Sequence, residues 1–480
     1  MRIVYPDNPD YDKDRVICNA RFDYRPSAIY YCANAGDVKA AIAAAGTNGV
    51  RIRSGGHQHE GMCSANGVHL IDVSCINRFD FKPGRVWIGA GALLKDVYVE
   101  LWRRFYYFPG GACGDVHVGG LTQGGGWGLG LRQYGLTCDS LIGAEIVTAS
   151  GDIYQIPRAG HTEDQELLQA LRGGGGGNFG VVTRFCFRLH PMAYGYVDLS
   201  VTWGDADLPG DSLDKLLRRW INVFPRDEDQ NLTTFMRLLL APSGSNDRLL
   251  LSGRYLGSMS NAQRTLERLL KGFRLPRVTY TLSPLRPGKG KGALRLSRDE
   301  RERLREHLGT HHGYQPGPAD LTSTCAGIPL RHKISSGFVS RPVDLNLVRP
   351  LINVIRNTTP EPVALARQYV SLHCLGGAAS DEPLPSAYAF RDRTVLLQYQ
   401  AWWQSDQARL DKRCIAWIEN FRKTMAPYTD GAFINFVDRD IPLAEYYKTK
   451  LPQVLVPVKK RWDPQDLFKF EMSIPLATQK

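Results

Sequence analysis

The stretch RIRSGGHQHEG, residues 51–61, places two histidines and a glutamate directly after a pair of glycines. A group of this kind could bind a metal, cradle a phosphate or hold an organic cofactor. A strand-like run, GVRIRS at 49–54, leads into it, so the glycines form a turn where the backbone can approach a neighbouring group closely. The partners of this turn elsewhere in the chain decide between these uses.

Three further glycine-rich stretches occur in the first 200 residues, and each is flanked by apolar, strand-like runs. They are PGGACG at 109–114, VGGLTQGGGWGLG at 118–130 and RGGGGGNFG at 172–180. None has the strand, G-x-G-x-x-G and helix order of a dinucleotide fingerprint, and no G-K-[ST] completes a phosphate-binding loop. Backbone N–H groups of such turns form anion-binding nests. The turns are therefore predicted to converge on one extended, phosphate-bearing ligand.

The sequence pattern changes near residue 196. Strand-like runs at 196–203, 233–241 and 247–257 alternate with helical patterns at 210–224 and 260–273. We expect an α+β chain whose second domain is an antiparallel sheet with helices on one face. The predicted division is 1–195 for the N-terminal domain, 196–430 for the second domain and 431–480 for a segment that returns to the first.

Composition narrows the class of protein. The 480 residues carry a formal net charge of +12, but the densest basic block, residues 286–309, mixes both signs in its second half. There, Ser297 and Glu300 have capping-box spacing, and Leu296, Leu304 and Leu308 form a buried stripe of the expected helix. No nucleic-acid motif, C-x-x-C pair, membrane-length apolar run or secretory signal is present. We expect a cytoplasmic protein, or a secreted one if a signal was removed, with no metal, nucleic-acid or membrane partner. The oligomeric state stays open.

Residues 51–61, 109–153 and 167–185 together resemble the FAD-binding domain of the vanillyl-alcohol-oxidase and p-cresol-methylhydroxylase (PCMH) superfamily. The tail KKRWDPQDLFKFEMSIP, at 459–475, resembles the closing segment of its berberine-bridge-enzyme-like branch. Within that branch the chain looks most like the gluco-oligosaccharide, chito-oligosaccharide and hexose oxidases. The resemblance implies a PCMH-type FAD-binding domain of two subdomains beside the antiparallel substrate domain.

By the same resemblance, FAD is attached bicovalently, through His57 to the 8α-methyl group and through Cys113 to C6 of the flavin. A neutral imidazole and a thiolate are suited to that electrophilic edge. His59 has no family role, and a solvent-facing or hydrogen-bonded histidine is expected there. The other implied FAD-binding residues are Arg53, Ser54, Gly55, Gly56, Val116, Gly119, Gly120, Gly124, Gly125, Trp127, Asp139, Gly176, Gly177, Asn178 and Val181.

The catalytic base is harder to assign. Phe433 and Phe436 stand where the family typically carries a pair of tyrosines, and phenylalanine cannot accept a proton. Gln398, Tyr134 and Asp438 are the catalytic candidates, with Asp440 and His373 as further titratable groups. If Gln398 faces the flavin, Tyr399 points to the opposite side of its strand. The expected substrate-binding residues are Trp127, His373, Gln398, Phe433 and Phe436.

The resemblance implies an FAD-dependent oxidase that takes a hydride from a hydroxyl-bearing carbon of a sugar, glycosylated metabolite or natural product. Oxygen would then reoxidise the flavin and form hydrogen peroxide. Val116 is small, as in family oxidases. One alternative is an oxidative cyclase or desaturase of natural-product biosynthesis, which the missing tyrosines favour. The other is an FAD dehydrogenase or a non-catalytic, carbohydrate-binding flavoprotein.

Overall fold

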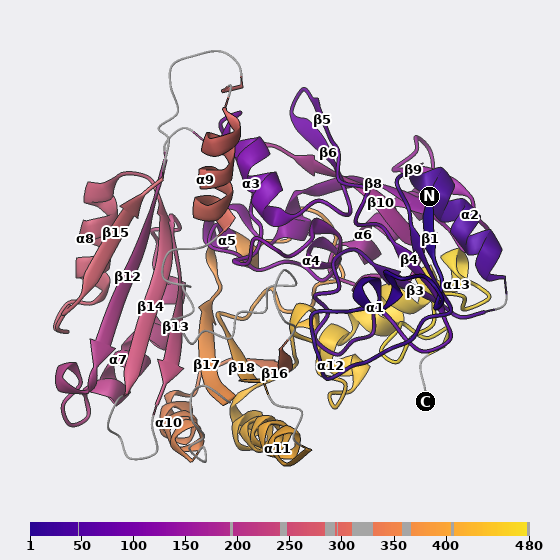
Figure 1. Ribbon diagram of the computed structural model, residues 1–480. Coiled ribbons are helices and arrows are strands. Elements are labelled where there is room, and N and C mark those ends of the chain that lie inside the picture. Colours follow the sequence, from indigo (N-terminus) through magenta and orange to yellow (C-terminus); the bar gives the residue numbers. More distant parts are fainter. Residues whose placement is uncertain are drawn as a thin grey trace.

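The computed structural model describes residues 1–46, 48–192, 195–240, 247–283, 293–294, 296–309, 330–357, 366–404 and 408–477. The basic stretch 286–292 therefore lies outside the described residues. Two groups of elements stand side by side, with the first 190 residues on one side and the strands after residue 196 on the other (Figure 1).

The N-terminal group contains two main sheets with helices packed around them. Its strands are β1 (Arg2–Val4), β2 (Ala28–Tyr31), β3 (Val50–Arg53), β4 (His69–Asp72), β5 (Phe79–Lys82), β6 (Arg85–Gly89), β7 (Tyr106–Tyr107), β8 (Leu141–Val147), β9 (Ile153–Ile156), β10 (Val181–Arg188) and β11 (His190–Pro191). Its helices are α1 (Tyr11–Asp14), α2 (Ala35–Ala45), α3 (Leu94–Trp102), α4 (Val118–Gln123), α5 (Leu131–Tyr134) and α6 (Thr162–Leu171).

These two sheets have different topologies. The first has the order β1-β2-β4-β3, in which β4 pairs in parallel with both β2 and β3. The second has the order β5-β6-β10-β8-β9 and is antiparallel throughout. The parallel pairing brings the end of β3, where the turn of residues 54–57 begins, beside the end of β4.

The second group is one antiparallel sheet of seven strands in the order β15-β12-β14-β13-β17-β18-β16. Its strands are β12 (Tyr196–Gly204), β13 (Leu232–Leu239), β14 (Arg248–Leu256), β15 (Val278–Leu282), β16 (Arg331–Phe338), β17 (Ala366–Cys374) and β18 (Val395–Trp403). The helices of this group are α7 (Ser212–Val223), α8 (Met259–Leu269), α9 (Arg298–Gly309), α10 (Val348–Arg356) and α11 (Ala408–Met425).

Helices α7, α8, α10 and α11 share a core with one face of this sheet, because alternate side chains of each strand point toward them. Val370 and Leu372 of β17 and Leu397 and Tyr399 of β18 lie in that core. The predicted antiparallel sheet with helices on one face is thus confirmed. The opposite face is left for the N-terminal group.

Helix α9 differs from the other helices of its group, because it packs on α3 (Figure 1). The predicted capping box is present: the Glu300 N–H donates to Oγ of Ser297, and the Ser297 N–H donates to Oε2 of Glu300. Leu304 and Leu308 are buried against Val99 and Trp102, as the expected stripe requires.

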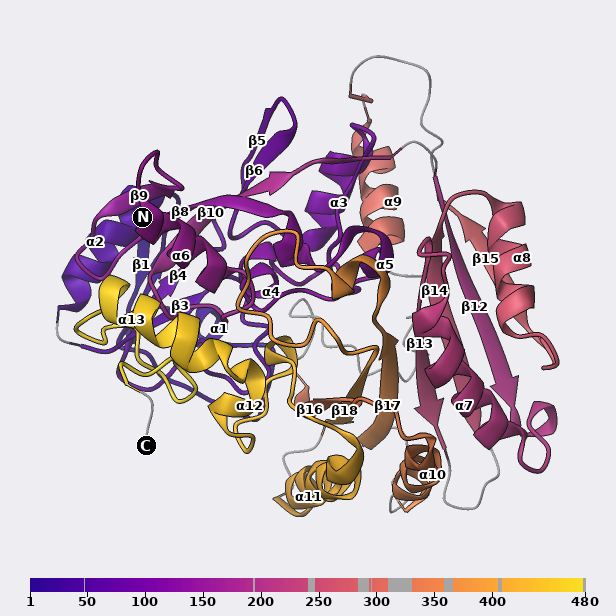
Figure 2. The same ribbon diagram turned by 180° about the vertical axis from the view of Figure 1, so that it is seen from behind.

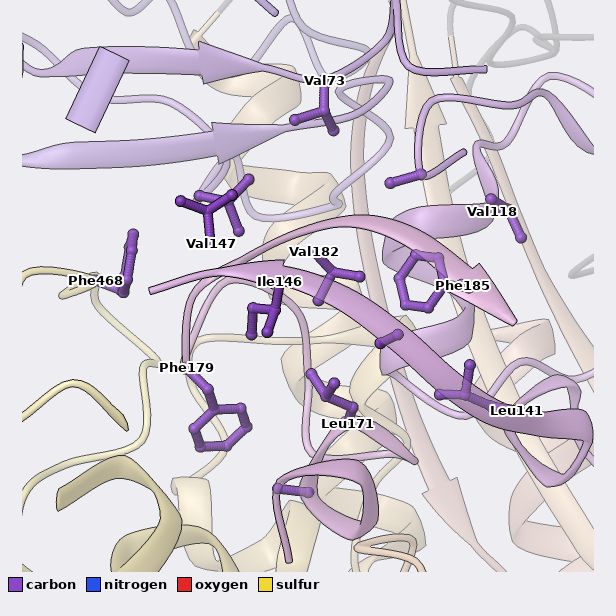
Figure 3. Packing of buried hydrophobic residues seen from close by; sticks show 14 of the residues in the cluster. Val73, Val118, Leu141, Ile146, Val147, Leu171, Phe179, Val182, Phe185 and Phe468 are labelled. Atoms are coloured by element: carbon purple, nitrogen blue, oxygen red, sulfur yellow. The ribbon is translucent and has the colours of Figure 1, made fainter. Parts of the chain in front are cut away.

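The C-terminal segment returns to the N-terminal group, where α12 (Leu443–Tyr447) and α13 (Val456–Trp462) lie (Figure 2). Figure 3 shows Phe468 of this segment in the cluster that also holds Ile146, Val147 and Val182 of the second sheet. The exact boundaries proposed at 195/196 and 430/431 remain predictions.

Candidate active site

A cavity lies where the turn after β3, helix α4, the glycine turn before β10 and the C-terminal segment come together. Three of the four glycine-rich stretches of the sequence meet in its wall, namely 51–61, 118–130 and 172–180. The predicted cofactor residues that line the cavity are Ser54, Gly55, Gly56, His57, Val116, Gly119, Gly120, Gly124, Gly176, Gly177 and Asn178.

Glycine is required at two positions of the wall, because a neighbouring side chain leaves no room for a Cβ atom. A Cβ added at Gly55 would lie 1.8 Å from Nδ1 of His117, and one added at Gly124 would lie 2.2 Å from Nδ2 of Asn435. Both neighbours line the cavity themselves. Larger residues at these two positions would displace two polar side chains that line the cavity.

Two imidazoles of the wall have buried nitrogens that need a partner. Among the described residues, Nε2 of His57 and Nδ1 of His117 are buried and form no hydrogen bond. Burial, with a smaller effect from the charge of His117, lowers the pKa of His57 to about 4, so its imidazole is neutral near pH 7. A buried polar atom without a partner is uncommon in a folded protein. Glycine turns beside these nitrogens fit an extended cofactor with phosphates and a reactive ring.

Comparisons with known proteins agree with this geometry. Residues 26–156 match the family model of the FAD binding domain, and residues 432–475 match that of berberine and berberine like proteins. An uncharacterized FAD-linked oxidoreductase of Bacillus subtilis is 28% identical, with 99% of this chain and 96% of the relative covered. Berberine bridge enzyme-like 9 of Arabidopsis thaliana is 27% identical, covering 95% of this chain and 85% of the relative.

The chain thus carries an FAD binding domain and a berberine-like C-terminal segment, and it is an FAD-linked oxidoreductase. Two solved structures show the same fold. Physcomitrella patens BBE-like 1 superposes with a TM-score of 0.81 at 24% identity, over 100% of this chain and 97% of that structure. Chitooligosaccharide oxidase gives a TM-score of 0.79 at 22% identity, over 99% and 97%. The resemblance to the PCMH-type superfamily is confirmed.

In this FAD-linked oxidoreductase, two charged residues predicted to contact FAD are engaged elsewhere. Nε of Arg53 lies 2.5 Å from Oδ2 of Asp72, and both side chains are buried. Asp139 pairs with Arg391, whose Nη2 lies 2.6 Å from its Oδ1, and accepts a hydrogen bond from the Leu136 N–H. Neither Arg53 nor Asp139 lines the cavity, so both support its walls from behind.

Four other predicted residues also lie outside the cavity lining. Cys113 is a free, half-buried cysteine that precedes the lining residues Val116 and His117, and burial raises the pKa of its thiol. Trp127 donates its indole N–H to the Cys374 carbonyl at 3.2 Å. The remaining two are Gly125, where an added Cβ would lie 3.3 Å from the ring of Phe433, and Val181, a buried residue of the core.

The three catalytic candidates, Gln398, Tyr134 and Asp438, do not line the cavity. Tyr134 stacks on Tyr107, with ring centroids 5.1 Å apart. Asp438 pairs with Lys333 at 2.5 Å in a buried ion cluster, which Asp440 joins at 3.0 Å. These contacts occupy the carboxylates of both aspartates.

Gln398 and His373 lie on the sheet face opposite the helices, where Oε1 of Gln398 and Nε2 of His373 are 2.9 Å apart. Tyr399 is on the other face, as predicted, and its hydroxyl donates to the Ser336 carbonyl. Burial lowers the pKa of His373 to about 4. The ring centroid of His373 is 5.8 Å from that of Phe436, the one expected substrate residue that lines the cavity.

Phe433 is buried behind Phe436, with ring centroids 5.3 Å apart. The two phenylalanines therefore form an edge-to-face apolar pair that starts at the cavity wall. Between them in sequence, Asn435 lines the cavity and accepts a hydrogen bond from the Gly126 N–H.

Sequence reasoning missed several residues of the wall: Arg51, Gln58, His59, Cys63, His117, Gln123, Asn435 and Tyr447. His59 was expected to face solvent or to form a hydrogen bond, and the hydrogen bond is present, with His332 as its partner. His117 and Asn435 carried a signal, since they lie next to the motif positions 113 and 116 and between 433 and 436. His332 carried none, because its partner is 273 residues away.

Proposed function

We propose that this protein is an FAD-dependent oxidase whose flavin is bound bicovalently through His57 and Cys113. It removes a hydride from a hydroxyl-bearing carbon of a carbohydrate or natural product, and oxygen is reduced to hydrogen peroxide. The observation that carries the proposal is the neutral imidazole of His57 at the wall of a cavity built from glycine turns, with its buried Nε2 bonded to no described residue. A lone pair on a neutral imidazole is the nucleophile that this attachment requires.

Different groups of cavity residues are assigned to different parts of the cofactor. Ser54, Gly55 and Gly56 offer backbone N–H groups for the pyrophosphate. Gly119, Gly120 and Gly124 are assigned to one side of the cofactor, and Gly176, Gly177 and Asn178 to another. Bound there, FAD supplies a hydride acceptor at its N5 position.

The remaining expected FAD residues have a supporting role in this proposal. Arg53 fixes the turn through Asp72, Asp139 holds Arg391, and Trp127, Gly125 and Val181 pack behind the wall. Val116 lines the cavity itself, and its small side chain leaves room for oxygen near the reacting centre. His373, Gln398 and Phe436 form the substrate side.

Peroxide formation tests the oxidase assignment. The purified holoprotein is assayed with sugars, oligosaccharides and aliphatic and benzylic alcohols, and peroxide and product mass are recorded. We expect at least one alcohol to yield a carbonyl product, trapped by hydroxylamine, together with one peroxide per turnover. Flavin reduction without peroxide would instead indicate a dehydrogenase, and a bound flavin that no substrate reduces would indicate a non-catalytic flavoprotein.

A second function, oxidative cyclisation or desaturation, is favoured by the apolar pair Phe433 and Phe436. Both rings replace hydroxyl-bearing side chains expected of an alcohol oxidase, so a carbon activated by its own substituents would need less help from a base. Product analysis separates the two functions, because a cyclised or desaturated product also loses two hydrogens but is not trapped by hydroxylamine.

A further inference from the structure

A pair of histidines stands at the proposed substrate end of the cavity, beside the apolar pair Phe433 and Phe436. Nδ1 of His59 lies 3.1 Å from Nε2 of His332, and the two rings are nearly perpendicular, at 80°. His59 lines the cavity, and the centroid of its ring is 6.3 Å from that of Phe436. A polar ring therefore lies next to the position where the expected hydroxyl is missing.

The side chain of Asn19 holds the backbone of both histidines in place. The buried amide of Asn19 donates to the carbonyl of His59 at 2.6 Å and to the carbonyl of His332 at 2.9 Å. Its Oδ1 accepts the N–H of His332 at 3.1 Å. One side chain thus fixes the separation of the two histidines, although they come from different halves of the chain.

An ion pair between the two residues that follow the histidines also holds the two segments together. Glu60 follows His59 and Lys333 follows His332, and Nζ of Lys333 lies 2.8 Å from Oε1 of Glu60 with both side chains buried. Lys333 also pairs with Asp438, two residues after Phe436. The strand β16 presents His332 to one side and Lys333 to the other, so the ion cluster anchors the histidine pair without occupying it.

The hydrogen bond between the rings leaves one nitrogen of His59 open. Nδ1 is taken by His332, while no described residue forms a hydrogen bond to Nε2 of His59. Burial lowers the pKa of His59 to about 3 and that of His332 well below its ordinary value, so both rings are neutral before substrate binds. In the tautomer where His59 donates from Nδ1 to His332, Nε2 carries a free lone pair.

We propose that Nε2 of His59 is the proton acceptor for the reacting hydroxyl, with His332 as the positioning residue that selects the required tautomer. This rests on the proposed function. The hydroxyl O–H bond breaks and its proton moves to Nε2 of His59. The C–H bond breaks and its hydride is accepted by FAD, so the carbon is oxidised by two electrons and a C=O bond forms. His332 accepts the Nδ1–H of the resulting imidazolium.

The test compares four forms of the holoprotein: wild type, His59→Ala, His59→Phe and, as the matched control, His161→Gln. His161 lies on the surface, where it contacts Glu163. With an alcohol that the wild type oxidises, we expect both His59 variants to lose about 100-fold or more in kcat, a general-base effect, at unchanged flavin content. Added imidazole should restore His59→Ala but not His59→Phe, whose ring fills the site. The control should stay close to wild type.

A second readout needs no substrate. In ¹⁵N spectra of histidine-labelled holoprotein, His59 should be neutral at pH 7, with Nδ1 protonated, and His332→Phe should shift that nitrogen. A charged His59 at pH 7, or an Nδ1 shift that does not change in His332→Phe, would contradict the proposed hydrogen-bonded pair of neutral histidines. Turnover of His59→Phe close to wild type would overturn the base while leaving the oxidase function intact. If no alcohol reduces the wild-type flavin, the proposed function fails and the base assignment fails with it, whereas the spectra still decide the hydrogen-bonded pair.

Discussion

His57 is the residue on which flavin attachment is expected to depend, with Cys113 as the second link. Because the two links are independent, His57→Ala alone should retain FAD through the thiol, as Cys113→Ala should through the imidazole. Only the double variant should release all of it. The measurement is the flavin absorbance that stays with acid-precipitated protein. Complete loss of flavin from the single His57→Ala variant would show that Cys113, which lies outside the cavity lining, forms no bond to it.

A substitution at Gly55 tests whether the close approach of this residue to His117 is required. The methyl group of Gly55→Ala would overlap His117, so we expect a loss of about 1–3 kcal/mol in folding stability and less FAD per chain. Thermal unfolding and the ratio of flavin to protein absorbance measure the two effects. Gly204→Ala is the control, since its Cβ would meet only Asp207 at 3.9 Å. Equal stability and flavin content in the two variants would contradict the assignment.

At the residue scale, the sequence predicted that the glycine turns and His57 lie together, and they line one cavity. It did not predict where the charged side chains point. Arg53 is the last residue of β3 before the turn, yet its guanidinium pairs with Asp72 on the neighbouring strand. Asp139 turns to Arg391, 252 residues away. Such pairings arise from strand register and domain packing, which a local motif does not encode.

Between elements, the buried cluster of Lys333 joins β16 to the turn after β3 and to the C-terminal segment. Burial lowers the pKa of Lys333, but Asp438 and Glu60 outweigh it and raise the pKa overall. Lys333→Met should cost about 3 kcal/mol or more, because it leaves buried carboxylates with fewer cations. Chemical denaturation measures this. Lys215→Met, at an exposed pair with Asp211, should cost at most about 1 kcal/mol, and equal losses in both variants would refute the cluster's role.

Strand alternation was predictable within one element and not between elements. Successive side chains of a strand point to opposite faces of the sheet, which predicts that Gln398 and Tyr399 lie on different faces. The structure confirms this placement. The same rule applied to β16 separates His332 from Lys333. It could not show that His332 meets His59, since that contact depends on how the sheet docks against the N-terminal group.

For the whole molecule, buried neutral histidines predict loss of stability in mild acid. Burial lowers the pKa of His59 to about 3 and that of His190 and His373 to about 4, against about 6.5 in the unfolded chain. Below pH 6.5 the unfolded state binds protons that the folded state does not, so stability falls as the pH drops from 6.5 toward 4. At pH 5 each should cost about 2 kcal/mol.

Melting temperatures at pH 7.5, 6 and 5 measure this slope. His373→Gln should flatten it relative to wild type, and the surface variant His161→Gln should not. A melting temperature that is constant between pH 7.5 and 5 would contradict the expected neutral histidines.

The overall architecture was largely predictable, because the pattern change near residue 196 and the tail motif indicate two domains and a returning segment. Within the described residues, no helix is long and apolar enough to cross a membrane. The contacts between the domains were not predictable, and they form the end of the cavity to which the proposed function assigns the substrate. Phe436, His59 and His332 meet there from three separate parts of the chain.

The mass of the acid-denatured wild-type protein tests the central assignment most directly. If the cavity holds bicovalent FAD, the intact mass exceeds that of the chain by one FAD and the precipitated protein stays yellow. A mass equal to that of the chain alone, with the flavin released into the supernatant, would contradict covalent attachment through His57 and Cys113.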